Sequence, residues 1–252
     1  MITEALHYLA TLPVTGKANR RFIRYSINLW SRARRCSREW ATHEENSRTA
    51  ILSAMDGLRQ KRTALVLGSG LLRDVPIDAL SKSFDTVVLV DLLHVASVRL
   101  WLHAKGYRNV RLIERDLSGY DEVAAGQNAD PLGFLRTVPY LDFVVSANLL
   151  SQIGRGVKQR IEAEQPNGMP DDTVARLLGA HLSGLAALPC RTCLLTDVSY
   201  AVIDRNGKTH EEADLLHRIA PPAARANWSW PVAPLGEESA DYQIIHKVIA
   251  AY

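Results

Sequence analysis

A turn that contains two glycines, and an acidic residue about twenty positions after it, are the part of this sequence whose residue types and spacing suggest chemistry. Gly68-Ser69-Gly70 follows the apolar run Ala64–Leu67, and Asp91 ends a second apolar run, Thr86–Val90. Glycines allow a sharp turn and let a ligand approach bare backbone. A carboxylate at the end of the second strand can accept hydrogen bonds from both hydroxyls of a ribose. The pattern therefore predicts half of a nucleotide-binding βαβ unit.

The residues that follow the turn narrow the kind of ligand. Leu72 stands where a dinucleotide site would have its third small residue, and Asp74 would repel a pyrophosphate at the start of the next helix. Both features disfavour a nicotinamide dehydrogenase. Arg73 and Asp74 suit a zwitterion better, since a guanidinium can pair with its carboxylate and a carboxylate with its ammonium. The alternative is that both are ordinary cap and surface residues.

Polar residues also follow the third and fourth predicted strands. Asp116 comes shortly after Asn109–Ile113, where an acid can accept from the exocyclic amine of adenine, although a loop or cap role remains open. Asn148 and Gln152 come directly after the continuously apolar run Leu141–Ala147. Ligands of parallel sheets bind at the carboxyl ends of the strands, near the topological crossover. Asn148 and Gln152 are therefore candidate site residues, with a cap or turn role as the alternative.

The sequence contains few signals for a residue that transfers protons. His43, His94 and Asp197 are candidate catalytic residues, with Tyr200 a further possibility, but a lone histidine more often packs in a core or lies on the surface. Asp197 is near the end of the predicted fifth strand, Thr192–Val198.

The cysteines do not predict a metal centre or a disulfide framework. Cys190 and Cys193 form a lone CxxC pair, and Cys36 is the only other cysteine in the sequence. We interpret Cys190 and Cys193 as packing residues and predict no metal ligands.

The elements that must position these residues alternate along the chain. Apolar residues at steps of three and four between about 18 and 58 predict a long helix or a helix pair, and every charged residue from Lys17 to Arg38 is basic. This basic face is either a patch for an anionic substrate or RNA, or a solvated face paired with acids elsewhere. We expect a loop over residues 154–172 that covers the site, and a short helix over Glu211–Ile219. Two closing antiparallel strands are expected around Trp228–Pro231 and Tyr242–Ala250.

The bulk properties fit one α/β domain with an added element. The chain has 252 residues, 47% of them hydrophobic and 23% charged, with a net charge of +3 that does not by itself imply nucleic acid. Its apolar runs are shorter than the roughly 18 residues of a membrane helix, and its start lacks a basic region before an apolar core. We therefore expect a cytoplasmic protein with no membrane partner.

Four stretches together resemble the class I S-adenosylmethionine-dependent methyltransferases. Val66–Gly70 is similar to their first motif, Asp91 to the acid that binds ribose, Asp116 to the acid that contacts adenine, and Asp142–Leu150 to their fourth motif. The resemblance covers about residues 60–252 and extends to a group of bacterial methyltransferase-like proteins of uncertain function. The sequence departs from the family's pattern at Val66, where an acid is common, and at the third glycine.

The resemblance implies a doubly wound, mostly parallel seven-stranded sheet with an antiparallel C-terminal edge hairpin. It divides the chain into an N-terminal helical lid or substrate element (1–60) and a Rossmann-like S-adenosylmethionine-binding domain (61–252). The implied cofactor is S-adenosylmethionine, and the product is S-adenosylhomocysteine. The implied cofactor-binding residues are Gly68, Ser69, Gly70, Arg73, Asp91, Leu92, Asp116, Leu117 and Asn148.

The implied reaction is an in-line methyl transfer to an oxygen or nitrogen of a small-molecule acceptor. DNA amine methylation is disfavoured because Ser146–Leu149 lacks the Asn/Asp-Pro-Pro-aromatic stretch of such enzymes. Two alternatives stay open. One is a binding or regulatory protein that has lost catalysis, and the other is an RNA methyltransferase that uses the basic N-terminal helices. The acceptor and the oligomeric state are not set by the sequence.

Overall fold

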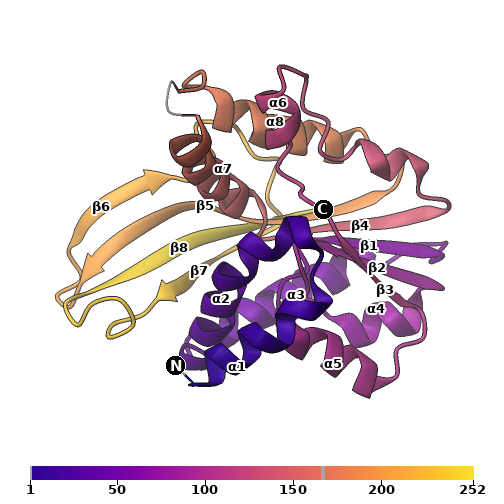
Figure 1. The fold of residues 1–252 in the computed structure, drawn as a ribbon, viewed down its shortest axis with the longest axis horizontal. Helices are drawn as coiled ribbons and strands as arrows, with labels where there is room; N and C mark the ends of the chain where they lie inside the picture. Colours follow the sequence, from indigo (N-terminus) through magenta and orange to yellow (C-terminus); the bar gives the residue numbers. More distant parts are fainter. Residues whose placement is uncertain (1, 166–167) are drawn as a thin grey trace.

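The computed structural model describes residues 2–165 and 168–252 and shows one central β-sheet with helices on both faces (Figure 1). Across the sheet the order is β3-β2-β1-β4-β5-β8-β7, with β6 paired to β5. β1 to β5 run parallel, whereas β8 is antiparallel to both β5 and β7. The doubly wound sheet with a C-terminal antiparallel hairpin is thus confirmed. The described strands are β1 (Thr63–Leu67), β2 (Thr86–Asp91), β3 (Val110–Glu114), β4 (Leu141–Ala147), β5 (Arg191–Asp204), β6 (Thr209–Asp214), β7 (Ala226–Ala233) and β8 (Tyr242–Ala251).

The helices form a layer on each side of the sheet. α2 to α5 pack on one face and α6 to α8 on the other, each through its own cluster of buried apolar side chains. The predicted helix pair near the N-terminus is present as α2 and α3. The described helices are α1 (Ile2–Thr11), η1 (Leu12–Val14), η2 (Lys17–Phe22), α2 (Ile23–Arg35), α3 (Ala41–Met55), α4 (Ile77–Ser83), α5 (Ala96–Lys105), α6 (Tyr120–Ala124), η3 (Gly133–Thr137), α7 (Leu150–Glu164) and α8 (Thr173–Ala186).

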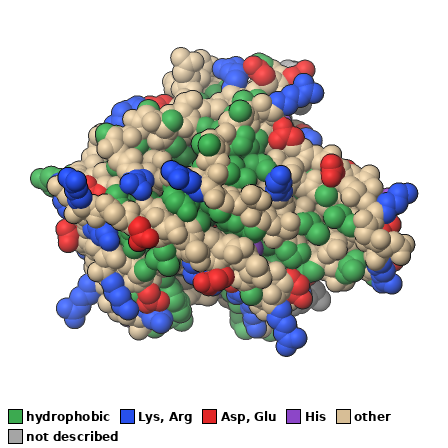
Figure 2. Space-filling view, turned by 180° about the vertical axis from the view of Figure 1, so that it is seen from behind, with side chains coloured by type: hydrophobic (Ala, Val, Ile, Leu, Met, Phe, Trp, Pro, Cys, Tyr) green, Lys and Arg blue, Asp and Glu red, His purple; other side chains and the backbone are tan. Residues whose placement is uncertain are grey.

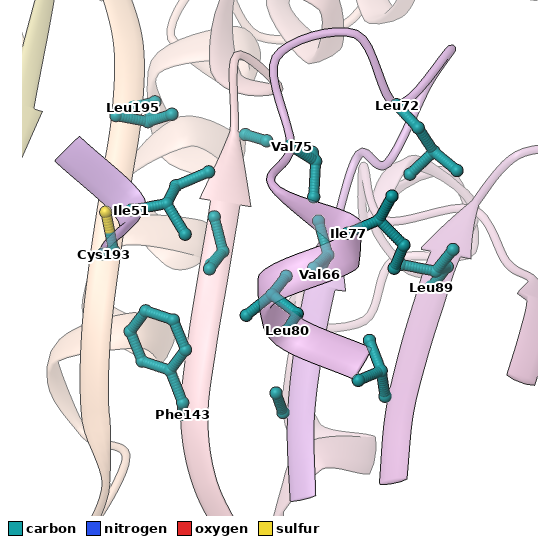
Figure 3. Close-up of a cluster of buried hydrophobic side chains, with 14 of the residues drawn as sticks. Ile51, Val66, Leu72, Val75, Ile77, Leu80, Leu89, Phe143, Cys193 and Leu195 are labelled. Carbon is teal, nitrogen blue, oxygen red and sulfur yellow. The ribbon is translucent and has the colours of Figure 1, made fainter. Parts of the chain in front are cut away.

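The central strands are buried on both faces, which explains their continuous apolar sequence. All five residues of β1 are buried. Figure 3 shows one of the two layers, where Leu80 of α4 lies over the central strands and Ile51 of α3 lies beside β5. Val66 is fully buried in this layer, so the position that carries an acid in many methyltransferases here belongs to the hydrophobic core.

Two element predictions were wrong. Residues 154–172 were expected to form a loop, but α7 continues to Glu164; residues 166–167 lie outside the described part. Gly154 lies inside α7 and faces α8, where a Cβ would lie 3.6 Å from a methyl carbon of Val174. The stretch expected to be a short helix, Glu211–Ile219, instead begins in strand β6.

The sheet is also larger than expected, with eight strands in the described residues instead of seven. β5 continues to Asp204, beyond the predicted end at Val198, and turns into β6. Figure 1 shows β6 and the outer parts of β5, β7 and β8 extending past the helices.

The outer surface carries mixed side chains. Figure 2, a view from behind, shows hydrophobic groups gathered near the middle of that face and Lys and Arg side chains spaced among other types. In the described part of the chain, every helix is too short or too polar to cross a lipid bilayer.

Gly68 is the glycine of the turn that the packing constrains most. Its φ is +72°, in the left-handed region, and a Cβ there would lie 3.0 Å from the Ala147 carbonyl oxygen and 3.1 Å from the Leu149 Cβ. The turn after β1 is therefore pressed directly against the end of β4. Only a residue without a side chain fits this approach.

We predict that Gly68→Ala lowers the free energy of unfolding by more than Gly57→Ala does. Gly57 has the same φ of +72° but open space around it, so its substitution reports only the left-handed conformation, about 1–2 kcal/mol. Gly68→Ala adds overlap with backbone, typically about 1–3 kcal/mol more. Urea denaturation of both variants measures the difference, and equal losses would contradict the close approach of the turn to β4.

Candidate functional site

A cavity of about 290 Å³ lies at the carboxyl edge of the sheet, between the strand ends and α7. Asp91 and Leu92 line it from the end of β2, and Asp116 and Leu117 from the segment after β3. Ile153 faces them from α7. The cavity volume is close to the lower end of the range for small-molecule sites, about 300–1,000 Å³.

Asp91 joins the glycine turn to the end of β2. Its Oδ2 accepts a hydrogen bond from the Gly70 N–H at 2.7 Å, and its Oδ1 accepts one from the Leu92 N–H at 2.8 Å. Burial raises the pKa of the Asp91 carboxyl to about 6, against the lowering effect of these two backbone donors. Each oxygen keeps a second lone pair, so the carboxylate can still accept from a ligand hydroxyl.

Asp116 is held by its own loop and by α7. Its Oδ1 accepts from the Ser118 N–H at 2.8 Å, and its Oδ2 pairs with the Arg160 guanidinium at 3.1 Å. Arg160 also lies over the Tyr120 ring, 3.9 Å from its centroid. This interaction ties α7 to the segment that follows β3, so the predicted adenine-side acid is at the cavity but already has a partner.

Directly before Leu149, which lines the cavity, Asn148 lies at the tip of β4. Its backbone has φ +49°, and its Nδ2 donates to Asp74 Oδ2 at 2.8 Å. Gln152, which lines the cavity, donates to the Asn148 carbonyl oxygen at 2.8 Å. Asn148 Oδ1 and Ser69 Oγ are buried and have no hydrogen-bond partner among the described residues. The turn and the tip of β4 thus hold polar atoms that a ligand can satisfy.

Arg73 and Asp74 do not act as a pair. Arg73 Nε donates to Glu44 of α3 at 2.5 Å, while Asp74 turns toward Asn148. Burial raises the pKa of the Asp74 carboxyl. Leu72 has φ +59°, so it holds the left-handed conformation that a glycine would adopt at lower cost, and its side chain is buried in the core.

A second group of polar and aromatic side chains lies beside Asn148, and we call it the His43 cluster: His43, Asp197, Trp228, Trp230 and His246. The His43 ring stacks on Trp230, with centroids 4.0 Å apart and planes at 7°. His43 Nδ1 accepts from Trp228 Nε1 at 3.0 Å, and its Nε2 is 3.4 Å from Asn148 Nδ2. Burial lowers the pKa of His43 to about 4, so the ring is neutral at neutral pH.

Asp197 and His246 form a hydrogen-bonded pair within this cluster. His246 Nδ1 is 2.5 Å from Asp197 Oδ2, and Asp197 Oδ1 is buried without a partner in the described structure. The register of β5 against β8 shifts between Asp197 and Ser199, at the level where β5 continues past β4. Such irregularities redirect side chains. His246 was missed at the level of the sequence, where its one signal is its place between Ile244 and Val248 on one face of β8.

The other catalytic candidates lie apart from the cavity. His94 is fully buried, and its Nε2 is 3.3 Å from the Ile113 carbonyl oxygen, which fits packing near β3. Tyr200 donates to Glu211 in the β5–β6 hairpin.

Cys193 is in the core and Cys190 is partly buried, both as free thiols. Within the described ranges, no three His, Cys, Asp or Glu side chains are grouped as metal ligands would be.

Several arginines of the basic N-terminal stretch are paired with acids. Arg35 makes two hydrogen bonds to Glu237, and Arg32 contacts Glu238 at 2.6 Å. Arg21 pairs with Glu164 of α7 at 3.2 Å. These contacts match the expectation of a basic face that pairs with acids elsewhere in the chain.

No family model and no curated protein matches this chain. Among solved structures, it is similar to a Burkholderia thailandensis 1,6-didemethyltoxoflavin-N1-methyltransferase with bound 1,6-didemethyltoxoflavin and S-adenosylhomocysteine, at 15% identity and a TM-score of 0.40, over 90% of this chain and 88% of that one. It is also similar to the N-methyltransferase NodS from Bradyrhizobium japonicum WM9 in complex with S-adenosylhomocysteine, at 12% identity and a TM-score of 0.39, over 82% and 86%. An S-adenosylmethionine-dependent methyltransferase from Aquifex aeolicus matches at 11% identity and a TM-score of 0.36, over 83% and 98%. Similarity at this level argues for no activity, so the function must be argued from the residues above.

We predict that the stability advantage of the wild type over His43→Gln shrinks as the pH falls from 7 to 5. The pKa of His43 is about 4 in the folded protein and near 6.5 when unfolded, so below pH 6.5 only the unfolded chain takes up the proton. That uptake lowers wild-type stability by up to about 1.4 kcal/mol per pH unit, and glutamine does not titrate. Urea denaturation at pH 7, 6 and 5 tests this, and a constant difference would contradict a buried, neutral His43.

Proposed function

We propose that this protein binds S-adenosylmethionine in the cavity at the carboxyl edge of the sheet and transfers its methyl group to an oxygen or nitrogen of a small-molecule acceptor. The observation that carries the proposal is the placement of Asp91 and Asp116 at the ends of neighbouring strands, on the wall of one partly apolar cavity. An adenosine carries groups complementary to these: two ribose hydroxyls and an exocyclic amine that donate hydrogen bonds, and a flat base that packs against apolar side chains.

The cavity walls support this assignment. Leu92, Leu117 and Ile153 provide apolar surface for a purine, and Asp91 has free lone pairs for the ribose hydroxyls. Asp116 is bound to Arg160, so an adenine amine would share its carboxylate with that guanidinium. The nicotinamide alternative is weaker because the turn is followed by the buried Leu72 and by the acid Asp74.

When bound, S-adenosylmethionine supplies a methyl group on a positively charged sulfur. The protein's own residues then need to hold the nucleoside, orient the acceptor and exclude water. The His43 cluster adjoins Asn148, since His43 Nε2 is 3.4 Å from Asn148 Nδ2. Where the acceptor must lose a proton, we assign His246 as the candidate base, because Asp197 fixes the orientation of its ring through Nδ1.

We assign the N-terminal helices the role of lid and specificity element. Phe22 and Tyr25 line the cavity from the N-terminal side. A wider cleft of about 690 Å³ between α2 and α7 adjoins the cavity and shares Tyr25, Arg155 and Gln159 with it. This cleft is the proposed entrance for the acceptor. α3 has a structural role instead, because its Ile51 and Ala54 pack in the core beside β5.

We predict that Asp91→Asn weakens binding of S-adenosylhomocysteine by about tenfold or more. The substitution removes a charged acceptor, and hydrogen bonds to charged groups contribute about 1.5–3 kcal/mol. Isothermal titration calorimetry measures the change. The matched control is Asp78→Asn on the exposed side of α4, which should bind as the wild type does.

Failure of the wild type to bind S-adenosylhomocysteine at millimolar concentration would contradict the proposal. Binding that is equally strong in Asp91→Asn would contradict the role of Asp91. Steep, salt-dependent RNA binding that is lost when Arg32, Arg34 and Arg35 are changed to Glu would instead favour an RNA acceptor.

The affinity for S-adenosylhomocysteine should also fall as the pH is lowered. Since the pKa of Asp91 is about 6 in the free protein, a proton competes with the ribose below that pH. We predict a dissociation constant that is nearly constant above pH 7 and rises as the pH falls from 6 to 5, by at most about tenfold per unit. Titration calorimetry across this range measures it. A flat profile in the wild type, or an equally steep one in Asp91→Asn, would contradict the assignment.

A further inference from the structure

Asp74 is a half-buried acid that the nucleoside site does not use. It follows the glycine turn, and its Oδ2 accepts from Asn148 Nδ2 at 2.8 Å. Burial disfavours its charged form. An acid kept in such a place costs stability unless a positive group or several donors compensate it.

The nearby cations are engaged elsewhere. Arg73, next in sequence to Asp74, bonds to Glu44 instead. Arg48 donates to the Arg73 carbonyl oxygen and pairs with Glu45 at 2.7 Å. Arg48 and Arg73 stabilise the Asp74 carboxylate at a distance, but the hydrogen bond that holds its Oδ2 comes from a neutral amide.

Two further buried polar atoms, one in the glycine turn and one at the tip of β4, lack a hydrogen-bond partner among the described residues. Asn148 is 5% exposed and Ser69 is 1% exposed, yet Asn148 Oδ1 and Ser69 Oγ have no partner within the described residues. Asn148 bonds to Asp74, and Ser69 is inside the glycine turn whose next residue, Gly70, bonds to Asp91. The Asp74 charge also raises the pKa of Asp91, so the two carboxylates act on each other across the turn. A group with a positive charge and several N–H donors fits this position.

We infer that Asp74 and Asn148 bind the ammonium group of the cofactor's amino-acid arm. In this chain the acid is Asp74, after the glycine turn, since Val66 before the turn has no carboxylate. The inference rests on the proposed function, because it takes the nucleoside to lie on Asp91. The arm then extends from the ribose, past the glycine turn, to the tip of β4. Asp74 accepts one ammonium N–H, and Asn148 Oδ1 accepts another. Asp74 and Asn148 are thus binding residues that set the preference for a ligand with an amino-acid arm.

The test compares two ligands that share the nucleoside and differ in the arm. S-adenosylhomocysteine carries the ammonium and carboxylate, and 5′-methylthioadenosine carries neither. Calorimetry should show that Asp74→Asn weakens S-adenosylhomocysteine by about 10- to 100-fold and changes 5′-methylthioadenosine by less than about twofold. Asp91→Asn should weaken both ligands by a similar factor. Asp78→Asn, the same change on an exposed part of α4, should affect neither.

A second measurement needs no variant and therefore does not depend on how Asp74→Asn folds. The wild type should bind 4-(5′-adenosylthio)butanoate, which is S-adenosylhomocysteine without its amino group, at least about tenfold more weakly than S-adenosylhomocysteine. Equal affinity for these two ligands would overturn the inference, as would an Asp74→Asn variant that weakens both original ligands equally. If none of the ligands binds the wild type, the proposed function itself fails.

Discussion

The structure depends on the hydrogen bond from the Gly70 N–H to the Asp91 carboxylate, which is 2.7 Å long. This bond holds the turn after β1 against the end of β2, and Gly68 presses the same turn against the tip of β4. Three neighbouring strands are thereby fixed relative to one another at their carboxyl ends. The cost is a desolvated carboxylate whose pKa is about 6. A group in this state gains from any ligand that donates further hydrogen bonds to it.

From this corner the polar groups extend in two directions. Toward β3 lie Asp116 and the ion pair with Arg160, which suit the base of a nucleoside. Toward β4 lie Asp74 and Asn148, followed by the His43 cluster. The order along the sheet edge is therefore base, ribose and charged arm. The methyl-bearing sulfur of the cofactor lies between the ribose and the arm, so the proposed chemistry needs the acceptor to approach between Asp91 and Asp74.

Sequence patterns predicted the parts of the fold that rest on local rules. Continuous apolar runs marked the buried parallel strands, and the glycines marked the turn. β6 was missed because Thr209–Asp214 is charged and exposed, and pairing with the extended β5 makes it a strand. α7 was partly missed because Gly154 looks like a helix breaker, and only the nearby α8 gives it a packing role.

The site residues that directly follow predicted strands could be predicted from the sequence. The contacts that those residues make with distant segments of the chain could not. The positions of Asp91, Asp116 and Asn148 at strand ends followed from the pattern of the chain. The turning of Arg73 toward Glu44, and the meeting of His43 with Asp197 through Trp230 and His246, depend on how α3 packs on the C-terminal hairpin. Contacts over such sequence distances leave no local signal.

A crystal structure with S-adenosylhomocysteine tests the central claim most directly. The account predicts electron density for the ribose with both hydroxyls on the Asp91 carboxylate, the adenine beside Leu92 and Ile153, and the turn at Gly68–Gly70 beneath the arm. Density for the ligand at another place, or an Asp91 carboxylate that makes no contact with the ribose, would contradict it.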